Sequence, residues 1–285
     1  MNQTIKITLQ KAVEVLNEND IDDARLDAEI LLAHVLQVNR IFIYTNFDFE
    51  LNDEQSAEYE KLIKRRAAHE PTAYIIGHRE FMQLDFVVNC SVLIPRPDTE
   101  ILVEAAVNRL KPMKGNLHIA DIGTGSGAIC ISILNLLENV FADAVDISVN
   151  AVETAKINAK HLNVFNRINF FVGDLLEPIK SNKYNAIVSN PPYIPNDVID
   201  TLDKDVAEYE PRQALDGGRD GLNFYRRLVN ESPALIVSGG FLAFEIGINQ
   251  AADITKLIEN SGYFKKIEIL KDLSNIERVI IAWIK

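Results

Sequence analysis

Hydrophobic residues in the first 70 or so positions recur every three or four residues, a spacing that places them on one face of a helix. This pattern predicts three helices, the third ending at Arg66 before Pro71. Their expected N-caps are Thr8 for the first, Asp22 or Asp23 for the second, and Asn52 or Asp53 for the third. Residues 1–73 are therefore predicted to form a small all-α helical bundle that is a domain of its own.

The next stretch, residues 74–97, loses the helical spacing. Phe81–Leu84 and Phe86–Val88 are typical of short strands, with Asn89 as a turn residue. We therefore expect a β-hairpin linker between two domains. A helix over Thr99–Leu110 is predicted to follow it.

From residue 98 to residue 285, short apolar runs alternate with helical stretches such as Gly127–Leu137 and Ala151–Leu162. The expected strands are Leu117–Ile122, Phe141–Val145, Ile168–Val172, Ala186–Ser189, Phe241–Ile246, Lys265–Leu270 and Arg278–Trp283. This alternation predicts an α/β domain with a mostly parallel, Rossmann-like sheet of seven strands. Ligands of such sheets bind beyond the carboxyl ends of the strands, so the residues that follow each strand are the candidates for chemistry.

The charge balance of the chain is acidic. Its 285 residues include 29 Lys and Arg against 41 Asp and Glu, a formal net charge of −12. The first 75 residues share this excess, with 8 basic and 14 acidic side chains. Proteins that bind nucleic acid through its phosphates usually have the opposite balance, so we expect no direct nucleic-acid partner.

The cysteines and the N-terminal residues bear on the cellular compartment in which the protein is expected. Cys90 and Cys130 have no CxxC spacing and are expected to be buried core thiols, so no metal site or disulfide is predicted. The opening MNQTIKITLQ lacks the basic and apolar regions of a signal peptide. Apolar runs stay well short of the roughly 20 residues that a membrane-spanning helix needs. We expect a cytoplasmic protein with no membrane partner, and a monomer because no oligomer signal is present.

A glycine-rich turn directly follows the first strand of the α/β domain, in DIGTGSGAI at residues 121–129. A turn of this kind before a helix brings backbone donors close to a ligand with no Cβ in the way. Asp146 ends the next strand, 23 residues after Gly123, where an acidic side chain can accept hydrogen bonds from both hydroxyls of a ribose. With Gly125 and Ala128 the turn matches a dinucleotide fingerprint, and with Gly125 and Gly127 it suits S-adenosylmethionine.

A second motif, NPPY, directly follows the strand Ala186–Ser189. The side chain of Asn190 and the carbonyl of Pro191 can accept hydrogen bonds from the two hydrogens of a planar NH2 group. Two consecutive prolines stiffen this backbone, and Tyr193 offers a flat ring against which a planar group can rest. The arrangement suits methylation of an amide or aromatic amine, because the acceptors orient a weakly nucleophilic nitrogen and stabilise its growing positive charge.

DIGTGSGAI, the AVDIS that contains Asp146, and NPPYI, in this order and spacing, resemble class I S-adenosylmethionine-dependent methyltransferases that act on nitrogen. Four further segments make the chain similar to the release factor glutamine methyltransferase family, also called HemK or PrmC. These segments are EPTAYIIGHREF (70–81), LIPRPDTE (93–100), YEPRQALDGGRDGL (209–222) and ERV (277–279). The resemblance covers nearly the whole chain.

The resemblance implies methyl transfer to the side-chain amide of the glutamine in the GGQ motif of peptide chain release factors. It implies that the N-terminal bundle binds another part of that protein substrate. The implied cofactor residues are Gly123, Thr124, Gly125, Ser126 and Gly127 along the methionine, Asp146 at the ribose, Asp174 and Leu175 beside the adenine, and Asn190. The implied substrate residues are Asn190, Pro191, Pro192 and Tyr193, of which Asn190, Pro191 and Tyr193 are the catalytic candidates.

Some positions depart from the family or stay open. Many members have a larger or aromatic residue at the Leu175 position and FYG where this chain has Phe81-Met82-Gln83. Arg96 and Glu100 either lie at the mouth of the pocket or form structural ion pairs.

Three other functions remain as alternatives. A DNA or RNA adenine amino-methyltransferase would use the same acceptors but would need to flip its base and to present a basic surface. A non-catalytic cofactor-binding module would not need an intact NPPY, and a dehydrogenase would need a hydride-transfer site.

Overall fold

The computed structural model describes residues 3–285, which divide into two compact units. The first unit holds the residues up to His78 together with Asp203–Tyr209. The second holds Arg79–Leu202 and Glu210–Lys285. The domain limits given above remain a prediction.

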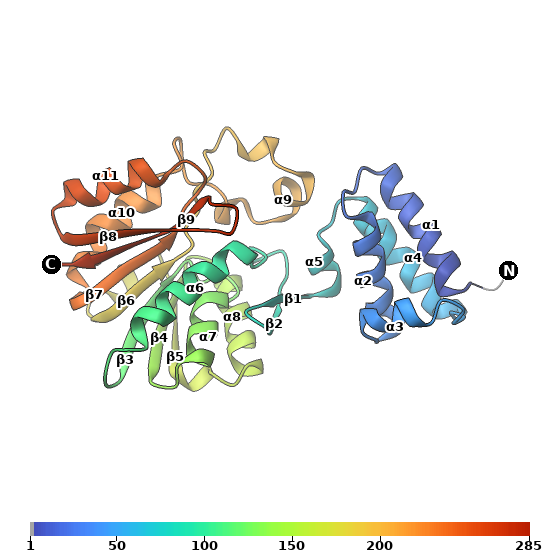
Figure 1. The fold of residues 1–285 in the computed structure, drawn as a ribbon, viewed down its shortest axis with the longest axis horizontal. Helices are drawn as coiled ribbons and strands as arrows, with labels where there is room; N and C mark the ends of the chain where they lie inside the picture. Colours follow the sequence, from blue (N-terminus) through green and yellow to red (C-terminus); the bar gives the residue numbers. More distant parts are fainter. Residues whose placement is uncertain (1–2) are drawn as a thin grey trace. The chain divides into compact units, whose positions relative to one another are not determined.

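The first unit is built from helices (Figure 1). These are α1 (Ile5–Glu18), α2 (Ala24–Leu36), α3 (Arg40–Thr45), α4 (Asp53–Ala67), α5 (Thr72–Ile76) and, from far along the chain, α9 (Lys204–Tyr209). A core of aliphatic side chains from α1, α2 and α4 holds them together. Within it the Tyr59 hydroxyl donates a hydrogen bond to the Ala28 carbonyl at 2.9 Å. The Tyr209 hydroxyl of α9 donates to the Ala68 carbonyl at 2.6 Å.

The start predicted for the first helix is wrong. Thr4, not Thr8, is the N-cap of α1, and its side chain accepts a hydrogen bond from the backbone N–H of Ile7. Thr8 is buried inside the helix. The third predicted helix is α4, where Asn52 and Gln55 form a reciprocal capping box. The helices α3 and α5 were not predicted, because six and five residues are too few to show a periodic pattern.

The second unit is an α/β layer structure around one large sheet, preceded by a hairpin (Figure 1). Its strands are β1 (His78–Phe81), β2 (Leu84–Val87), β3 (Leu117–Ile122), β4 (Val140–Asp146), β5 (Ile168–Val172), β6 (Tyr184–Ser189), β7 (Ile236–Glu245), β8 (Phe264–Lys271) and β9 (Glu277–Ile284). Its α-helices are α6 (Pro97–Leu110), α7 (Ala128–Leu136), α8 (Val149–His161), α10 (Asn223–Glu231) and α11 (Ala251–Ser261).

The large sheet has the strand order β5-β4-β3-β6-β7-β9-β8. Strands β3 to β7 pair in parallel, and β9 runs antiparallel to both β7 and β8. This confirms the predicted Rossmann-like α/β fold with a mostly parallel seven-stranded sheet. The chain leaves β3 toward β4 on one side and reaches β6 on the other, so the order reverses between β3 and β6. A reversal of this kind opens a crevice for a ligand at the carboxyl ends of the strands.

Two hydrophobic layers cover the two faces of the sheet. Side chains alternate along each strand, as Phe241 and Leu242 do, so that neighbours point into different layers. Helices α6, α7 and α8 cover one face, and α10 and α11 cover the other (Figure 1). Neither layer covers the carboxyl ends of the central strands.

The predicted hairpin is present, but its strands lie earlier in the sequence than expected. They are His78–Phe81 and Leu84–Val87, joined by a turn at Met82-Gln83. Asn89 opens a separate turn after the second strand, as predicted: its carbonyl accepts a hydrogen bond from the Val92 N–H at 3.1 Å. Met82 and Gln83 both have positive φ, 51° and 60°, which matches the right-handed twist of a tight hairpin. Neither is a glycine or an asparagine, so the usual sequence signal for this turn is missing.

Replacement of Asp27 by alanine is expected to destabilise the first unit by about 3 kcal/mol, because a buried ion pair loses one partner. Asp27 accepts hydrogen bonds from Arg66 Nε at 2.6 Å and from the Thr72 hydroxyl at 2.8 Å. Urea denaturation of the variant measures the loss. The control is Glu58→Ala, since the Lys61–Glu58 pair is exposed and contributes about 0–1 kcal/mol. Equal midpoints for the two variants would contradict the assigned role.

Candidate active site

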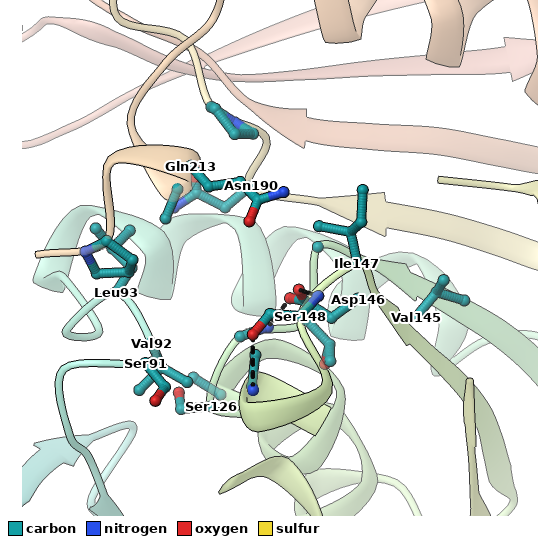
Figure 2. Close-up of a pocket in the computed structure, with 18 of the residues that line it drawn as sticks. Ser91, Val92, Leu93, Ser126, Val145, Asp146, Ile147, Ser148, Asn190 and Gln213 are labelled. Carbon is teal, nitrogen blue, oxygen red and sulfur yellow. Dashed lines mark hydrogen bonds between the residues drawn. The ribbon is translucent and has the colours of Figure 1, made fainter. Parts of the chain in front are cut away.

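A cavity of about 580 Å³ lies beyond the carboxyl ends of β3, β4, β5 and β6, within the size range of small-molecule sites (Figure 2). Its walls come from the turns after these strands, from residues 90–96 before α6 and Thr99 within it, from residues 211–214, and from α10. The cavity therefore lies where the reversal of strand order predicts a ligand.

The glycine turn forms the floor of this cavity. The N–H groups of Gly123 and Thr124 donate to the Val145 carbonyl at 2.9 and 3.0 Å, which ties the turn to the neighbouring strand. Gly125 has φ +55°, and a Cβ placed on it would meet no atom within 4 Å. Gly123, Thr124, Gly125 and Ser126 line the cavity, whereas Gly127 instead lies at the N-cap of α7.

Asp121 supports the turn from below. It is fully buried, and its Oδ2 accepts hydrogen bonds from the Thr124 hydroxyl at 2.8 Å and from the Cys130 N–H at 3.2 Å. Burial raises the pKa of Asp121 to about 6, and these hydrogen bonds counteract part of the rise. Its role is to hold the turn, since it does not line the cavity.

Asp146 presents a half-exposed carboxylate to the cavity. Its Oδ2 accepts from the N–H of Gly125 and its Oδ1 from the N–H of Ser148, both at 2.9 Å (Figure 2). Burial raises its pKa, although these backbone donors favour the charged form. Each oxygen retains a lone pair, so a vicinal diol could donate one hydrogen bond to each. The residues present thus fit a ribose.

Asp174 and Leu175 also line the cavity, after β5. Asp174 accepts a hydrogen bond from Arg227 of α10 at 2.9 Å, and Leu175 has a left-handed backbone with φ +48°. Arg227 and Phe224, one helical turn apart, complete this wall. These two residues could not be predicted from the sequence, because nothing in the pattern of α10 distinguishes them from surface positions.

Asn190 lies on the wall opposite Asp146. A Cβ placed on Gly123 would lie 4.0 Å from its backbone oxygen, so the NPPY segment and the glycine turn are neighbours. Its side-chain nitrogen donates to the Thr99 hydroxyl at 3.2 Å. In Figure 2 the side-chain oxygen of Asn190 points toward the side of the cavity where Asp146 and Ser148 lie.

The other NPPY residues lie in different surroundings. Pro192 lines the cavity, whereas the lining residues within 3–285 do not include Pro191 or Tyr193. Pro191 is buried and Tyr193 is half-buried, with its hydroxyl 3.3 Å from the Glu245 carboxylate. Burial, followed by the nearby carboxylate of Glu245, raises the pKa of Tyr193. The structure therefore brings Asn190 and Pro192 to the cavity and holds Tyr193 behind them.

A glycine-rich loop, residues 215–221, holds the chain after NPPY. The Gly217 N–H donates to the Ile194 carbonyl at 2.8 Å. A Cβ placed on Gly217 would lie 2.8 Å from the backbone of Tyr193, and one on Gly221 would lie 2.3 Å from its carbonyl oxygen. Only glycine lets this loop approach the Tyr193 backbone so closely.

Further lining residues come from two of the segments that carry the family resemblance. Arg96 lines the cavity, and its guanidinium donates to the buried Glu210 carboxylate at 2.6 Å. Gln213 also lines the cavity, beside Asn190 (Figure 2). Glu100 accepts a hydrogen bond from the Met82 N–H at 2.7 Å and does not line the cavity. Cys90 is exposed and lines the cavity too, so the prediction that it is a buried core thiol is wrong.

A sheet of this order, with a glycine turn after β3, an acidic residue at the end of β4 and NPPY after β6, defines a class I methyltransferase. Within residues 3–285, no helix has the length and apolar character to cross a bilayer. The same residues contain no group of three or more His, Cys, Asp or Glu side chains that could hold a metal ion.

Comparison with known proteins extends this class to a family. The family model of the PrmC N-terminal domain matches residues 8–77, and that of the methyltransferase small domain matches residues 97–207. The release factor glutamine methyltransferase of Clostridium acetobutylicum is 43% identical over 98% of both chains. That of Geobacter sulfurreducens is 41% identical over 97% of this chain and 95% of its own. The chain therefore belongs to the release factor glutamine methyltransferase family.

A solved structure supports the fold alone. A methyltransferase from Pyrococcus furiosus aligns with a TM-score of 0.51 over 79% of this chain and 98% of its own, at 17% identity. At this identity the likeness concerns the arrangement of the sheet and helices, not the substrate.

Proposed function

We propose that this protein methylates the side-chain amide nitrogen of the glutamine in the GGQ motif of peptide chain release factors, with S-adenosylmethionine as the methyl donor. The observation that carries the proposal is the placement of Asn190, whose side-chain oxygen faces the cavity beside the glycine turn. Family membership over almost the full length of the chain supports the choice of substrate. The cofactor, when bound, supplies a sulfonium methyl group.

The NPPY segment orients the glutamine amide. The Asn190 side chain, which lines the cavity, accepts one hydrogen of the substrate NH2 group. The Pro191 carbonyl, although Pro191 itself does not line the cavity, is the acceptor that we propose for the other. These contacts draw the lone pair of the nitrogen out of conjugation and direct it at the methyl carbon. They also stabilise the positive charge that grows on the nitrogen. No strong general base is needed, because the methylated nitrogen is acidic and loses its proton afterwards.

The other side of the cavity binds the cofactor. Gly123, Thr124, Gly125 and Ser126 lie along its methionine part, and the open space at Gly125 leaves the backbone accessible. Asp146 accepts hydrogen bonds from the ribose. Asp174 and Leu175 lie beside the adenine, next to Phe224, which offers an aromatic ring where Leu175 lacks one.

Mass spectrometry of a release factor after incubation with the protein and S-adenosylmethionine tests the proposal. The GGQ peptide should gain the mass of one methyl group. A release factor in which that glutamine is replaced by alanine is the matched control and should gain none. Labelled cofactor offered with DNA tests the alternative, and label in DNA with an unmodified release factor would overturn the proposal.

A further inference from the structure

We propose that Thr99 and Glu245 are positioning residues that decide which way the Asn190 side-chain amide faces. This inference rests on the proposed function and deepens it. Asn190 can orient a substrate NH2 group only if it presents its oxygen, because its own NH2 group would repel the substrate hydrogens. The two ends of an asparagine amide are almost equal in shape, so packing alone does not choose between them.

Glu245 begins a series of two hydrogen bonds that leads through Thr99 to Asn190. It ends β7 beneath the NPPY segment and is 3% exposed. Its Oε2 accepts a hydrogen bond from the Thr99 hydroxyl at 2.6 Å, and its Oε1 accepts one from the Tyr193 hydroxyl at 3.3 Å. As an ionised carboxylate it can only accept, so both hydroxyls must direct their protons at it.

Thr99 in turn determines which end of the Asn190 side-chain amide faces it. The Thr99 hydroxyl has one proton, and it donates this proton in its hydrogen bond to Glu245. Only a lone pair of the hydroxyl oxygen is therefore left for the contact with Asn190. The partner at 3.2 Å must then be a donor, which is the Asn190 NH2 group. A flipped amide would place the Asn190 oxygen next to the Thr99 oxygen with no proton between them, which is unfavourable at this partly buried position. The Asn190 oxygen is thereby turned into the cavity, as Figure 2 shows.

The surroundings of Glu245 make its charge sensitive to pH. Burial raises its pKa to about 7, and the Thr99 hydrogen bond is the largest of the influences that lower it again. The groups that face it are Thr99 and Asp98 of α6, Tyr193 after β6, Tyr225 of α10 and Arg278 of β9. Arg278 forms its own ion pairs with Asp98 at 3.0 Å and Asp272 at 2.8 Å. A protonated Glu245 could donate to Thr99 and so reverse the direction of both hydrogen bonds.

The first test replaces Thr99 by valine, which keeps the shape of the side chain and removes its hydroxyl. The turnover number for release factor methylation should fall roughly tenfold or more, as for a lost buried hydrogen bond. The dissociation constant for S-adenosylmethionine should stay near that of the wild type. Thr99→Ser should restore most of the turnover. The control is Thr255→Val in α11, whose hydroxyl has no hydrogen-bond partner within residues 3–285.

A double-mutant cycle distinguishes positioning from general damage. If Thr99 acts through Asn190, adding Thr99→Val to Asn190→Ala should cost little further turnover. Effects that multiply would overturn the proposal, as would equal turnover of Thr99→Val and Thr255→Val.

The pH profile gives an independent readout. Turnover at saturating cofactor should fall as the pH drops through about 7, since Glu245 then takes up a proton. Glu245→Gln has no group to titrate and should lose this limb of the profile, with lower turnover because an amide can donate as well as accept. An unchanged acid limb in Glu245→Gln would contradict the proposal. If the wild type itself fails to methylate release factors, the proposed function fails, and the orientation of Asn190 is then judged separately by NMR of its side-chain amide.

Discussion

Asn190→Ala is expected to lower the turnover number for release factor methylation by about 10²–10³-fold while cofactor binding is largely retained. The estimate comes from the loss of one preorganised partner of a charge that develops in the transition state, about 3 kcal/mol. Asn190 faces the cavity with an acceptor whose direction is fixed by Thr99, so its removal leaves one substrate hydrogen without a partner. Single-turnover kinetics at saturating cofactor measure the effect on the chemical step directly.

The control for this variant is Asn185→Ala on β6, the strand that leads into NPPY. The Asn185 side chain accepts a hydrogen bond from the His118 N–H at 2.9 Å, away from the cavity, and its loss should leave turnover near that of the wild type. Near-normal turnover of Asn190→Ala would show that its side chain does not orient the substrate.

Asp146→Asn is expected to weaken S-adenosylmethionine binding by about 3 kcal/mol, roughly a hundredfold, as for the loss of hydrogen bonds to a charged acceptor. The carboxylate accepts two backbone N–H groups, one on each oxygen, and would accept the ribose hydroxyls in addition. An asparagine has only one such oxygen, so its NH2 group would face either Gly125 or Ser148. Isothermal titration calorimetry measures the dissociation constant.

Turnover at saturating cofactor should be much less affected in Asp146→Asn than in Asn190→Ala, because Asp146 lies on the cofactor side of the cavity. Asp253→Asn, an exposed position on α11 paired with Lys256, is the matched control. A dissociation constant equal to that of the wild type would refute the assignment of Asp146.

The sheet and the cavity were predictable because they follow from patterns of neighbouring residues. Short, mostly apolar runs such as Leu117–Ile122, in which every residue except His118 is buried, are typical of the central strands of a parallel sheet. The glycine turn follows β3 and Asp146 ends β4, and because these two strands pair in parallel, topology brings the turn and Asp146 together. The same reasoning placed Asn190, since β6 pairs directly with β3.

The remaining parts depend on contacts between distant residues or on unusual turn residues. Nothing local to Thr99 or Glu245 indicates that they meet across 146 positions of the sequence. Phe224 and Arg227 reach the cavity only because of the way α10 packs. The hairpin turn at Met82-Gln83 has positive φ at both residues without a glycine or asparagine, so its position could not be predicted.

The glycine-rich loop at 215–221 packs closely on the chain after NPPY because two of its residues have no side chain. Gly217 and Gly221 are buried against the backbone of Tyr193, whereas Arg219 and Asp220 between them are exposed. A side chain at either glycine would collide with the Tyr193 backbone, whereas the exposed Arg219 has no such restriction and Asp220 pairs with Arg226 at the start of α10. The two glycines thus set how closely the loop packs on NPPY, and a substitution of Arg219 at the exposed tip should leave that packing unchanged.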